Sequence, residues 1–223
     1  MEADARESGR RPSPDPPLCW SLVPFFGSCG LYLFLWLPAE EPSWNSALAK
    51  CLPILYLALF VYNTAPSGPY GRFVWLGLLC SALGDIVLIW PNQFLFGMTA
   101  FALAYLLYFK ALGWQPTHKA LLESVAAVIV LYFGFLQPHL PSRLSFPMLV
   151  YAVILGLMLW RALARGGSAA LGGLFFSISD AVLAWDTFIW SLPSGRMIIM
   201  VTYYAAQALL ALSTVEEGND PLA

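Results

Sequence analysis

The chain has 223 residues, of which 59% are hydrophobic and only 11% are charged, and its mean hydropathy is +0.69. An ordinary soluble domain carries about 25% charged residues, so this composition excludes a soluble globular protein and indicates a membrane protein. The net charge is −2 and no basic stripe is present, so the sequence gives no reason to expect a nucleic-acid partner.

Eight apolar segments follow a polar start. Residues 1–17 are charged and rich in proline, and we expect a disordered cytoplasmic tail there rather than a signal peptide. A helix needs about 20 apolar residues to cross a bilayer. Apolar runs bounded by Pro, Gly and charge predict spans over 18–38, 45–62, 72–90, 93–112, 118–136, 144–164, 168–190 and 196–215. The fold class is therefore an all-α polytopic bundle over 18–215, followed by a short acidic cytoplasmic tail at 216–223.

The basic residues give the orientation, because Lys and Arg collect in short cytoplasmic loops. With eight spans, the loops on one side hold only Arg143 and Arg196. The other side, which includes the N-terminal tail, holds Arg6, Arg10, Arg11, Arg72, Lys110, Lys119, Arg161 and Arg165. This asymmetry predicts that both termini are cytoplasmic. A seven-span topology would not separate the basic residues between the two sides in this way.

The two halves of the chain resemble each other. The sequence reads DIVLIW from Asp85 and DAVLAW from Asp180, and the same 95-residue offset relates Tyr108 to Tyr203. Parallel repeats of this kind occur in polytopic membrane proteins. We therefore expect a 4+4 parallel repeat with Asp85 and Asp180 at similar depth, the alternative being chance similarity between apolar helices.

Asp85 and Asp180 are the leading functional candidates, because a carboxylate in the middle of a span costs roughly 2.5 to 3.5 kcal/mol on insertion scales. Other polar residues of the spans lie at comparable depth or on the same helix faces. The candidate substrate-binding residues are Lys50, Ser81, Tyr108, Tyr151, Ser177, Tyr203 and Gln207. Structural roles stay open: a simple Asp–Lys pair or interhelical hydrogen bond for the aspartates, and hydrogen bonds to their own helices for the serines.

Two neighbouring carboxyl groups in an apolar site favour a state in which one is protonated and the other is ionised. Glycosidases use such a pair to cleave acetals. We therefore expect acid–base cleavage of an acid-labile lipid bond. No cofactor or metal is expected, because His118 and His139 lie in predicted loops and the cysteines, which we expect to be free apolar residues, lack metal-ligand spacing: Cys19, Cys29, Cys51 and Cys80.

Four segments together resemble the lysoplasmalogenase family of multipass membrane proteins, which includes the YhhN-like bacterial members. They are KCLP from Lys50 to Pro53, LGDIVLIW around Asp85, GGLFFSISDAVLAW around Asp180, and TYYAAQALLALS in the last span. The resemblance covers nearly the whole chain after residue 18 and is closest to the vertebrate transmembrane members.

The resemblance implies hydrolysis of the 1-alkenyl ether bond of choline and ethanolamine lysoplasmalogens, in the endoplasmic reticulum membrane. The products would be a fatty aldehyde and glycerophosphocholine or glycerophosphoethanolamine. It places Asp85 and Asp180 on the family's paired acidic positions. Family members often have His at the position of Tyr105 and Asn near Asp186, so the resemblance assigns these two residues no role. Lys50 would bind the lipid phosphate or pair with one aspartate.

Other classes of function stay open on the residues alone. A proton-coupled transporter also uses intramembrane acids and parallel repeats. An intramembrane aspartyl protease is a weaker candidate, because the ALGD segment ending at Asp85 lacks the first glycine of the GxGD signature. A nonenzymatic adaptor is the third class. The family resemblance favours the enzyme, whose expected partners are a lysophospholipid, water and the bilayer; the sequence does not indicate an oligomeric state.

Overall fold

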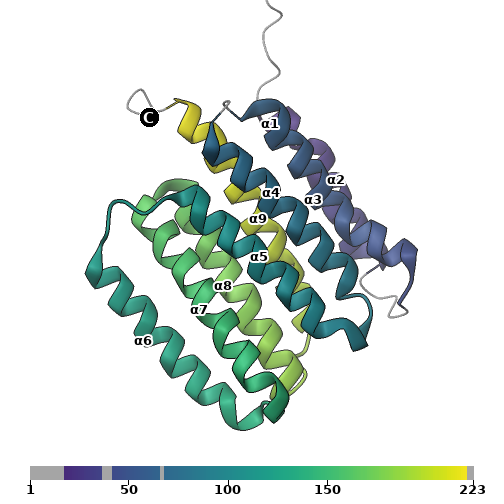
Figure 1. The fold of residues 1–223 in the computed structure, drawn as a ribbon. Coiled ribbons are helices and arrows are strands. Elements are labelled where there is room, and N and C mark those ends of the chain that lie inside the picture. Colours follow the sequence, from purple (N-terminus) through teal and green to yellow (C-terminus); the bar gives the residue numbers. More distant parts are fainter. Residues whose placement is uncertain (1–17, 37–41, 66–67, 220–223) are drawn as a thin grey trace, which may run out of the picture.

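The computed structural model describes residues 18–36, 42–65 and 68–219, and its regular elements over these ranges are all helices (Figure 1). Seven are long and apolar enough to cross a membrane: α3 (Trp44–Thr64), α4 (Pro69–Val87), α5 (Phe94–Leu112), α6 (Lys119–Leu136), α7 (Ser142–Arg165), α8 (Gly167–Phe188) and α9 (Gly195–Asn219). The first apolar segment is shorter and contains α1 (Leu18–Ser21), α2 (Val23–Leu31) and the π-helical turn η1 (Tyr32–Trp36). The predicted polytopic all-α fold is confirmed.

Capping residues and glycines determine where several helices begin and end. Ser43 caps α3, because its hydroxyl accepts a hydrogen bond from the Ser46 amide at 3.1 Å. Gly166 and Gly167 have φ angles of 82° and 56°, a conformation that residues with a Cβ rarely adopt. They allow α7 to turn directly into α8. The short 3-10 helices η2 (Pro91–Gln93) and η3 (Gln137–His139) lie in other connections.

The structure describes part of the predicted C-terminal tail but not the N-terminal one. The tail at 1–17 lies outside the described residues, as do the last residues of the predicted first span. The predicted acidic tail at 216–223 begins inside α9, which continues to Asn219. There Glu216 accepts a hydrogen bond from the Ser168 amide at 3.2 Å, and Glu217 pairs with Arg165. These contacts extend α9 beyond the apolar run that defined its predicted end.

The helices of the two halves pack on one another in largely the same order. In the first half α2 packs on α3, α3 on α4 and α4 on α5; in the second half α6 packs on α7, α7 on α8 and α8 on α9. The last helix of each half also crosses to the other half, so that α5 packs on α7 and α9 packs on α3 (Figure 1). This pairing supports the predicted 4+4 repeat.

Glycines at equivalent positions allow the closest helix pairs to approach. A Cβ added to Gly77 of α4 would lie 2.3 Å from the Tyr108 ring of α5. A Cβ added to Gly172 of α8 would lie 3.0 Å from Leu210 of α9. The two glycines are separated by the same offset as Asp85 and Asp180. The repeat therefore preserves the contact surface as well as the acidic residue.

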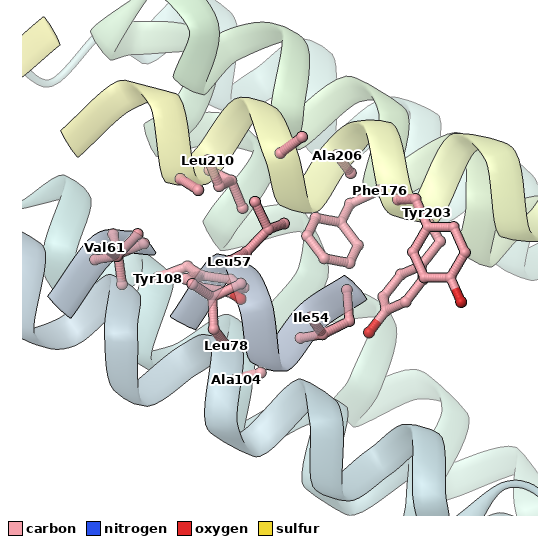
Figure 2. Close-up of a cluster of buried hydrophobic side chains, with 14 of the residues drawn as sticks. Ile54, Leu57, Val61, Leu78, Ala104, Tyr108, Phe176, Tyr203, Ala206 and Leu210 are labelled. Carbon is pink, nitrogen blue, oxygen red and sulfur yellow. The ribbon is translucent and has the colours of Figure 1, made fainter. Parts of the chain in front are cut away.

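The main core lies between α3, α4, α5, α8 and α9, where the side chains in Figure 2 meet. Ile54 and Leu57 of α3, Leu78 of α4 and Phe176 of α8 are fully buried there. By contrast, α6 lies at the edge of the bundle, on the opposite side from α2 and α3 (Figure 1). Its apolar side chains are largely exposed, as expected for a helix that faces acyl chains.

Candidate active site

Asp85 and Asp180 line the same cavity, which has a volume of about 680 Å³. Pockets for small molecules commonly measure about 300–1,000 Å³. The cavity extends from the two aspartates to the end of the bundle where α3, α7 and α9 begin and where α4 and α8 end. Much of its wall is apolar and comes from side chains such as Phe94, Met98 and Leu183. The cavity can therefore hold a molecule with an apolar chain and a reactive polar part.

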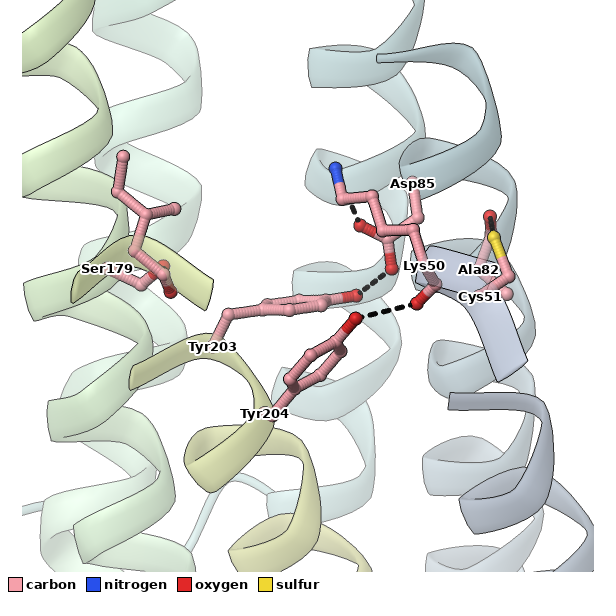
Figure 3. Close-up of polar contacts among 8 residues, drawn as sticks. Lys50, Cys51, Ala82, Asp85, Ser179, Tyr203 and Tyr204 are labelled. Carbon is pink, nitrogen blue, oxygen red and sulfur yellow. Dashed lines mark hydrogen bonds and ion pairs between the residues drawn. The ribbon is translucent and has the colours of Figure 1, made fainter. Parts of the chain in front are cut away.

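Asp85 forms a buried ion pair two residues before the C-terminal end of α4. The Lys50 Nζ atom of α3 lies 3.2 Å from Asp85 Oδ1, and the Tyr203 hydroxyl of α9 donates to Oδ2 at 2.6 Å (Figure 3). The side chain of Asp85 is 2% exposed and that of Lys50 is 13% exposed. Tyr204 holds the backbone in place, because its hydroxyl donates to the Lys50 carbonyl at 2.9 Å. Asp85 is thus a carboxylate with a cation beside it.

Asp180 of α8 is bound by two tyrosine side chains. The Tyr105 hydroxyl of α5 donates to Asp180 Oδ2 at 2.6 Å, and the Tyr151 hydroxyl of α7 donates to the same oxygen at 2.7 Å. In the described part of the chain, no ion pair includes Asp180. Two phenols therefore bind one oxygen of this carboxyl group, and the other oxygen takes part in neither bond.

The two carboxyl groups are held by equivalent helices. The partners of Asp85 come from α3 and α9, and those of Asp180 come from α7 and α5, which are the corresponding helices of the other half. The Phe176 ring connects the two sites. Its centroid lies 5.2 Å from that of Tyr105 and 5.7 Å from that of Tyr203. The arrangement gives two similarly built carboxyl sites that differ in charge.

Comparison with known proteins places the chain in a family. The model of the YhhN family matches residues 45–214, which include α4, α8 and both aspartates. The chain belongs to the YhhN family. The predicted family resemblance is therefore confirmed.

Three relatives of this YhhN protein are each named as a lysoplasmalogenase. Lysoplasmalogenase TMEM86B of Rattus norvegicus is 47% identical over 194 residues, which are 87% of this chain and 83% of the relative. Lysoplasmalogenase TMEM86B of Homo sapiens is 47% identical over 200 residues, or 90% and 88% of the two chains. A lysoplasmalogenase of Mycobacterium tuberculosis is 30% identical over 184 residues, or 76% and 68%. No solved structure matches the chain.

The structure brings three of the seven predicted substrate-binding residues to the cavity of this YhhN protein. Lys50, Tyr151 and Tyr203 line the cavity together with the aspartates. Lys50 pairs with Asp85, which is one of the two roles that the sequence left open for it. These three side chains are positioned to act on the carboxyl groups.

The other four predicted residues are not among those that line the cavity: Ser81, Tyr108, Ser177 and Gln207. The Tyr108 hydroxyl donates to Gln207 Oε1 at 2.8 Å, with Ser81 at 3.4 Å, in a fully buried cluster of the core. Ser177 donates to the Gly173 carbonyl of its own helix at 3.0 Å. A serine hydroxyl in a helix often donates to the carbonyl one turn back, and this is the structural role that the sequence left open for Ser177.

Sequence reasoning missed two residues of the site. Tyr105 received no role, yet it donates to Asp180; its spacing of three from Tyr108 on one helix was the available signal. Asp186 also lines the cavity, and its Oδ1 accepts a hydrogen bond from the Leu192 amide at 2.6 Å. Among the described residues, no group of His, Cys, Asp and Glu has a metal-binding arrangement.

Proposed function

We propose that this protein is a lysoplasmalogenase, which hydrolyses the vinyl ether bond of choline and ethanolamine lysoplasmalogens. The products are a fatty aldehyde and glycerophosphocholine or glycerophosphoethanolamine. The observation that carries this proposal is that one ion-paired and one phenol-bound aspartate, Asp85 and Asp180, line a single cavity with apolar walls. The names of relatives that cover most of the chain support the same reaction.

Asp180 acts as the acid in this mechanism. Cleavage of a vinyl ether begins when a proton is added to the alkenyl carbon, which creates an oxocarbenium ion. Asp180 forms no ion pair with the residues that the structure describes, and a carboxyl group in such a site is suited to hold a proton. Both phenols bind Oδ2, so Oδ1 is the oxygen available to carry the transferable proton.

Asp85 acts as the carboxylate partner. Its ion pair with Lys50 keeps a negative charge in the cavity wall, where it stabilises the oxocarbenium ion. It also accepts a proton from the water molecule that adds to this ion and forms a hemiacetal. The hemiacetal collapses to the aldehyde and the glycerol hydroxyl. The proton spent on carbon is balanced by the proton released from water, and transfer of that proton from Asp85 to Asp180 restores the starting state.

Purified protein in neutral detergent tests the proposal through aldehyde release from a defined lysoplasmalogen. We expect Asp85→Asn and Asp180→Asn each to abolish release while Glu123→Gln, which changes an exposed acid on α6, retains it. A saturated 1-alkyl lysolipid should be inert, because it has no double bond to protonate. Activity retained by either Asp variant would remove that residue from the catalytic pair.

The orientation of the helices belongs to the same proposal. The end of the bundle away from the cavity carries Arg72, Lys110, Lys119, Arg161 and Arg165. This supports cytoplasmic termini and a cavity that faces the non-cytoplasmic side of an endoplasmic reticulum membrane. Labelling of single cysteines placed at either end, by a membrane-impermeant reagent in sealed microsomes, tests the orientation.

A proton-coupled transporter is the second candidate, and the matched helix contacts of the two halves favour it. It uses the same two aspartates as proton carriers. Its signature is flux of a substrate across a sealed vesicle that depends on a proton gradient and yields no aldehyde.

A further inference from the structure

The outer end of the cavity carries its own charged side chains. Arg143 is the second residue of α7 and Arg196 is the second residue of α9, and both line the cavity. Asp186, near the end of α8, lines it as well. A Cβ added to Gly195 would lie 2.5 Å from Asp186 Oδ1, so this carboxylate lies against the start of α9. Three helices thus bring two cations and one anion to this outer end, which we call the mouth of the cavity.

The two arginines are placed at the cavity rather than elsewhere on this end of the bundle. In the described part of the chain, Arg143 and Arg196 are the only Lys or Arg residues at the helix ends on this side of the bundle. Both of them line the cavity rather than other parts of this surface. Lys50 lies deeper in the cavity, beside Asp85. The basic side chains at this end of the described helices are therefore gathered where the cavity opens.

The spacing along the helices matches a glycerophospholipid. Asp186 lies six residues beyond Asp180 on α8, and Arg196 lies seven residues before Tyr203 on α9, which binds Asp85. At 1.5 Å per residue, the mouth is about 10 Å from the carboxyl groups along these axes. Roughly seven bonds join the phosphorus of a lysoplasmalogen to its reactive alkenyl carbon, a span of roughly 8 Å at the extension of a peptide chain.

We propose that Arg143 and Arg196 bind the phosphate of the substrate and that Asp186 faces its amine. The inference rests on the proposed function and names the part of the site that selects the substrate. Two arginines and one carboxylate complement a zwitterionic head group, because guanidinium groups bind phosphate and a carboxylate attracts an ammonium group. The glycerol backbone then spans the distance to the catalytic pair, and the chain follows the apolar wall.

Two substrates with the same alkenyl chain test the inference: a choline lysoplasmalogen and a 1-alkenylglycerol, which has no head group. We expect Arg143→Gln and Arg196→Gln each to raise KM for the lysoplasmalogen about tenfold and to leave kcat unchanged. A tenfold change corresponds to the lower end of the range for a hydrogen bond to a charged group, as expected at an exposed site. KM for the alkenylglycerol should not change. Arg72→Gln, at the opposite end of the bundle, is the matched control. Equal effects on both substrates, or none on either, would overturn the inference.

A binding measurement separates this inference from the proposed function. Saturated 1-alkyl-glycerophosphocholine should bind the wild-type protein more tightly than 1-alkylglycerol, even if no aldehyde is ever released. The difference should vanish in the protein that carries both Arg143→Gln and Arg196→Gln. Equally strong competition by phosphatidylcholine vesicles would overturn the inference, since the arginines would then bind the bilayer.

The role of Asp186 has its own test. Asp186→Asn keeps an oxygen that accepts the Leu192 amide but removes the charge. Wild-type protein should prefer a choline lysoplasmalogen over the alkenyl-glycerophosphate that lacks an amine, and the variant should lose this preference. An unchanged preference would show that Asp186 does not face the amine.

Discussion

The buried pair of Lys50 and Asp85 gives a direct test of how charge is distributed in the site. Lys50→Met and Asp85→Asn each remove one charge and leave the other in a cavity wall where Asp85 is only 2% exposed. Breaking a buried ion pair in this way costs about 3–5 kcal/mol. Because Lys50 is 13% exposed and lines the cavity, we expect about 3 kcal/mol for each single variant.

The double variant Lys50→Met/Asp85→Asn should be more stable than either single variant by at least about 2 kcal/mol, because it leaves no uncompensated charge. Unfolding in mixed micelles of neutral detergent and dodecyl sulfate, followed by tryptophan fluorescence, measures these free energies. If the losses of the single variants simply add in the double variant, the two residues do not act as a pair. A folded double variant without activity would separate stability from chemistry.

The remaining predictions concern the phenols at Asp180 and the glycine contacts. Tyr105→Phe and Tyr151→Phe should each lower kcat about 10- to 100-fold, because each phenol stabilises the carboxylate that forms as Asp180 gives up its proton, and a hydrogen bond to a charged group contributes about 1.5–3 kcal/mol. Tyr132→Phe should leave kcat nearly unchanged, since its hydroxyl donates to a backbone carbonyl of α8 at 2.6 Å; equal losses in all three variants would contradict this assignment. Gly77→Ala should destabilise the fold by about 1–3 kcal/mol because its Cβ would lie 2.3 Å from a facing ring of α5. A Cβ added to Gly134 of α6 would have no atom within 4 Å, so Gly134→Ala should leave the stability unchanged or raise it by up to about 1 kcal/mol. The same unfolding assay measures both variants, and a loss as large as that of Gly77→Ala would refute the contact argument.

The membrane spans could be predicted because the thickness of the bilayer sets the length of an apolar helix. Two details could not. The first segment contains Pro24, Gly27 and Gly30, and the structure divides it into α1, α2 and η1 rather than one long helix. The end of α9 depends on contacts of Glu216 with α8 and of Glu217 with α7, which a hydropathy profile does not contain.

The carboxyl groups of the candidate site could be found from sequence because a charge inside an apolar span is costly. Their partners could be found only in part. Tyr105 looks like any other aromatic residue of an apolar helix until α5 and α8 are brought together. Arg143 and Arg196 look like ordinary interfacial residues, since only the fold shows that loops far apart in sequence lead to one cavity. For Ser177, helix periodicity gives the face of the helix, but only the structure gives the partner of the hydroxyl group, which is a carbonyl of its own helix.

The repeat explains how one chain obtains two carboxyl groups in one cavity, but an exact duplication would give them the same chemistry. Acid–base hydrolysis needs one carboxyl group that gives a proton and one that stays charged. The residue equivalent to Lys50 in the second half is Ser145 by the offset of the aspartates, and α7 reaches Asp180 through the phenol of Tyr151 instead. Among the described residues, the two sites therefore differ in the cation on α3 and in the number of phenols that bind the carboxyl group. In the mechanism proposed for this protein, the repeat supplies the geometry and Lys50 supplies the difference in charge between the two aspartates.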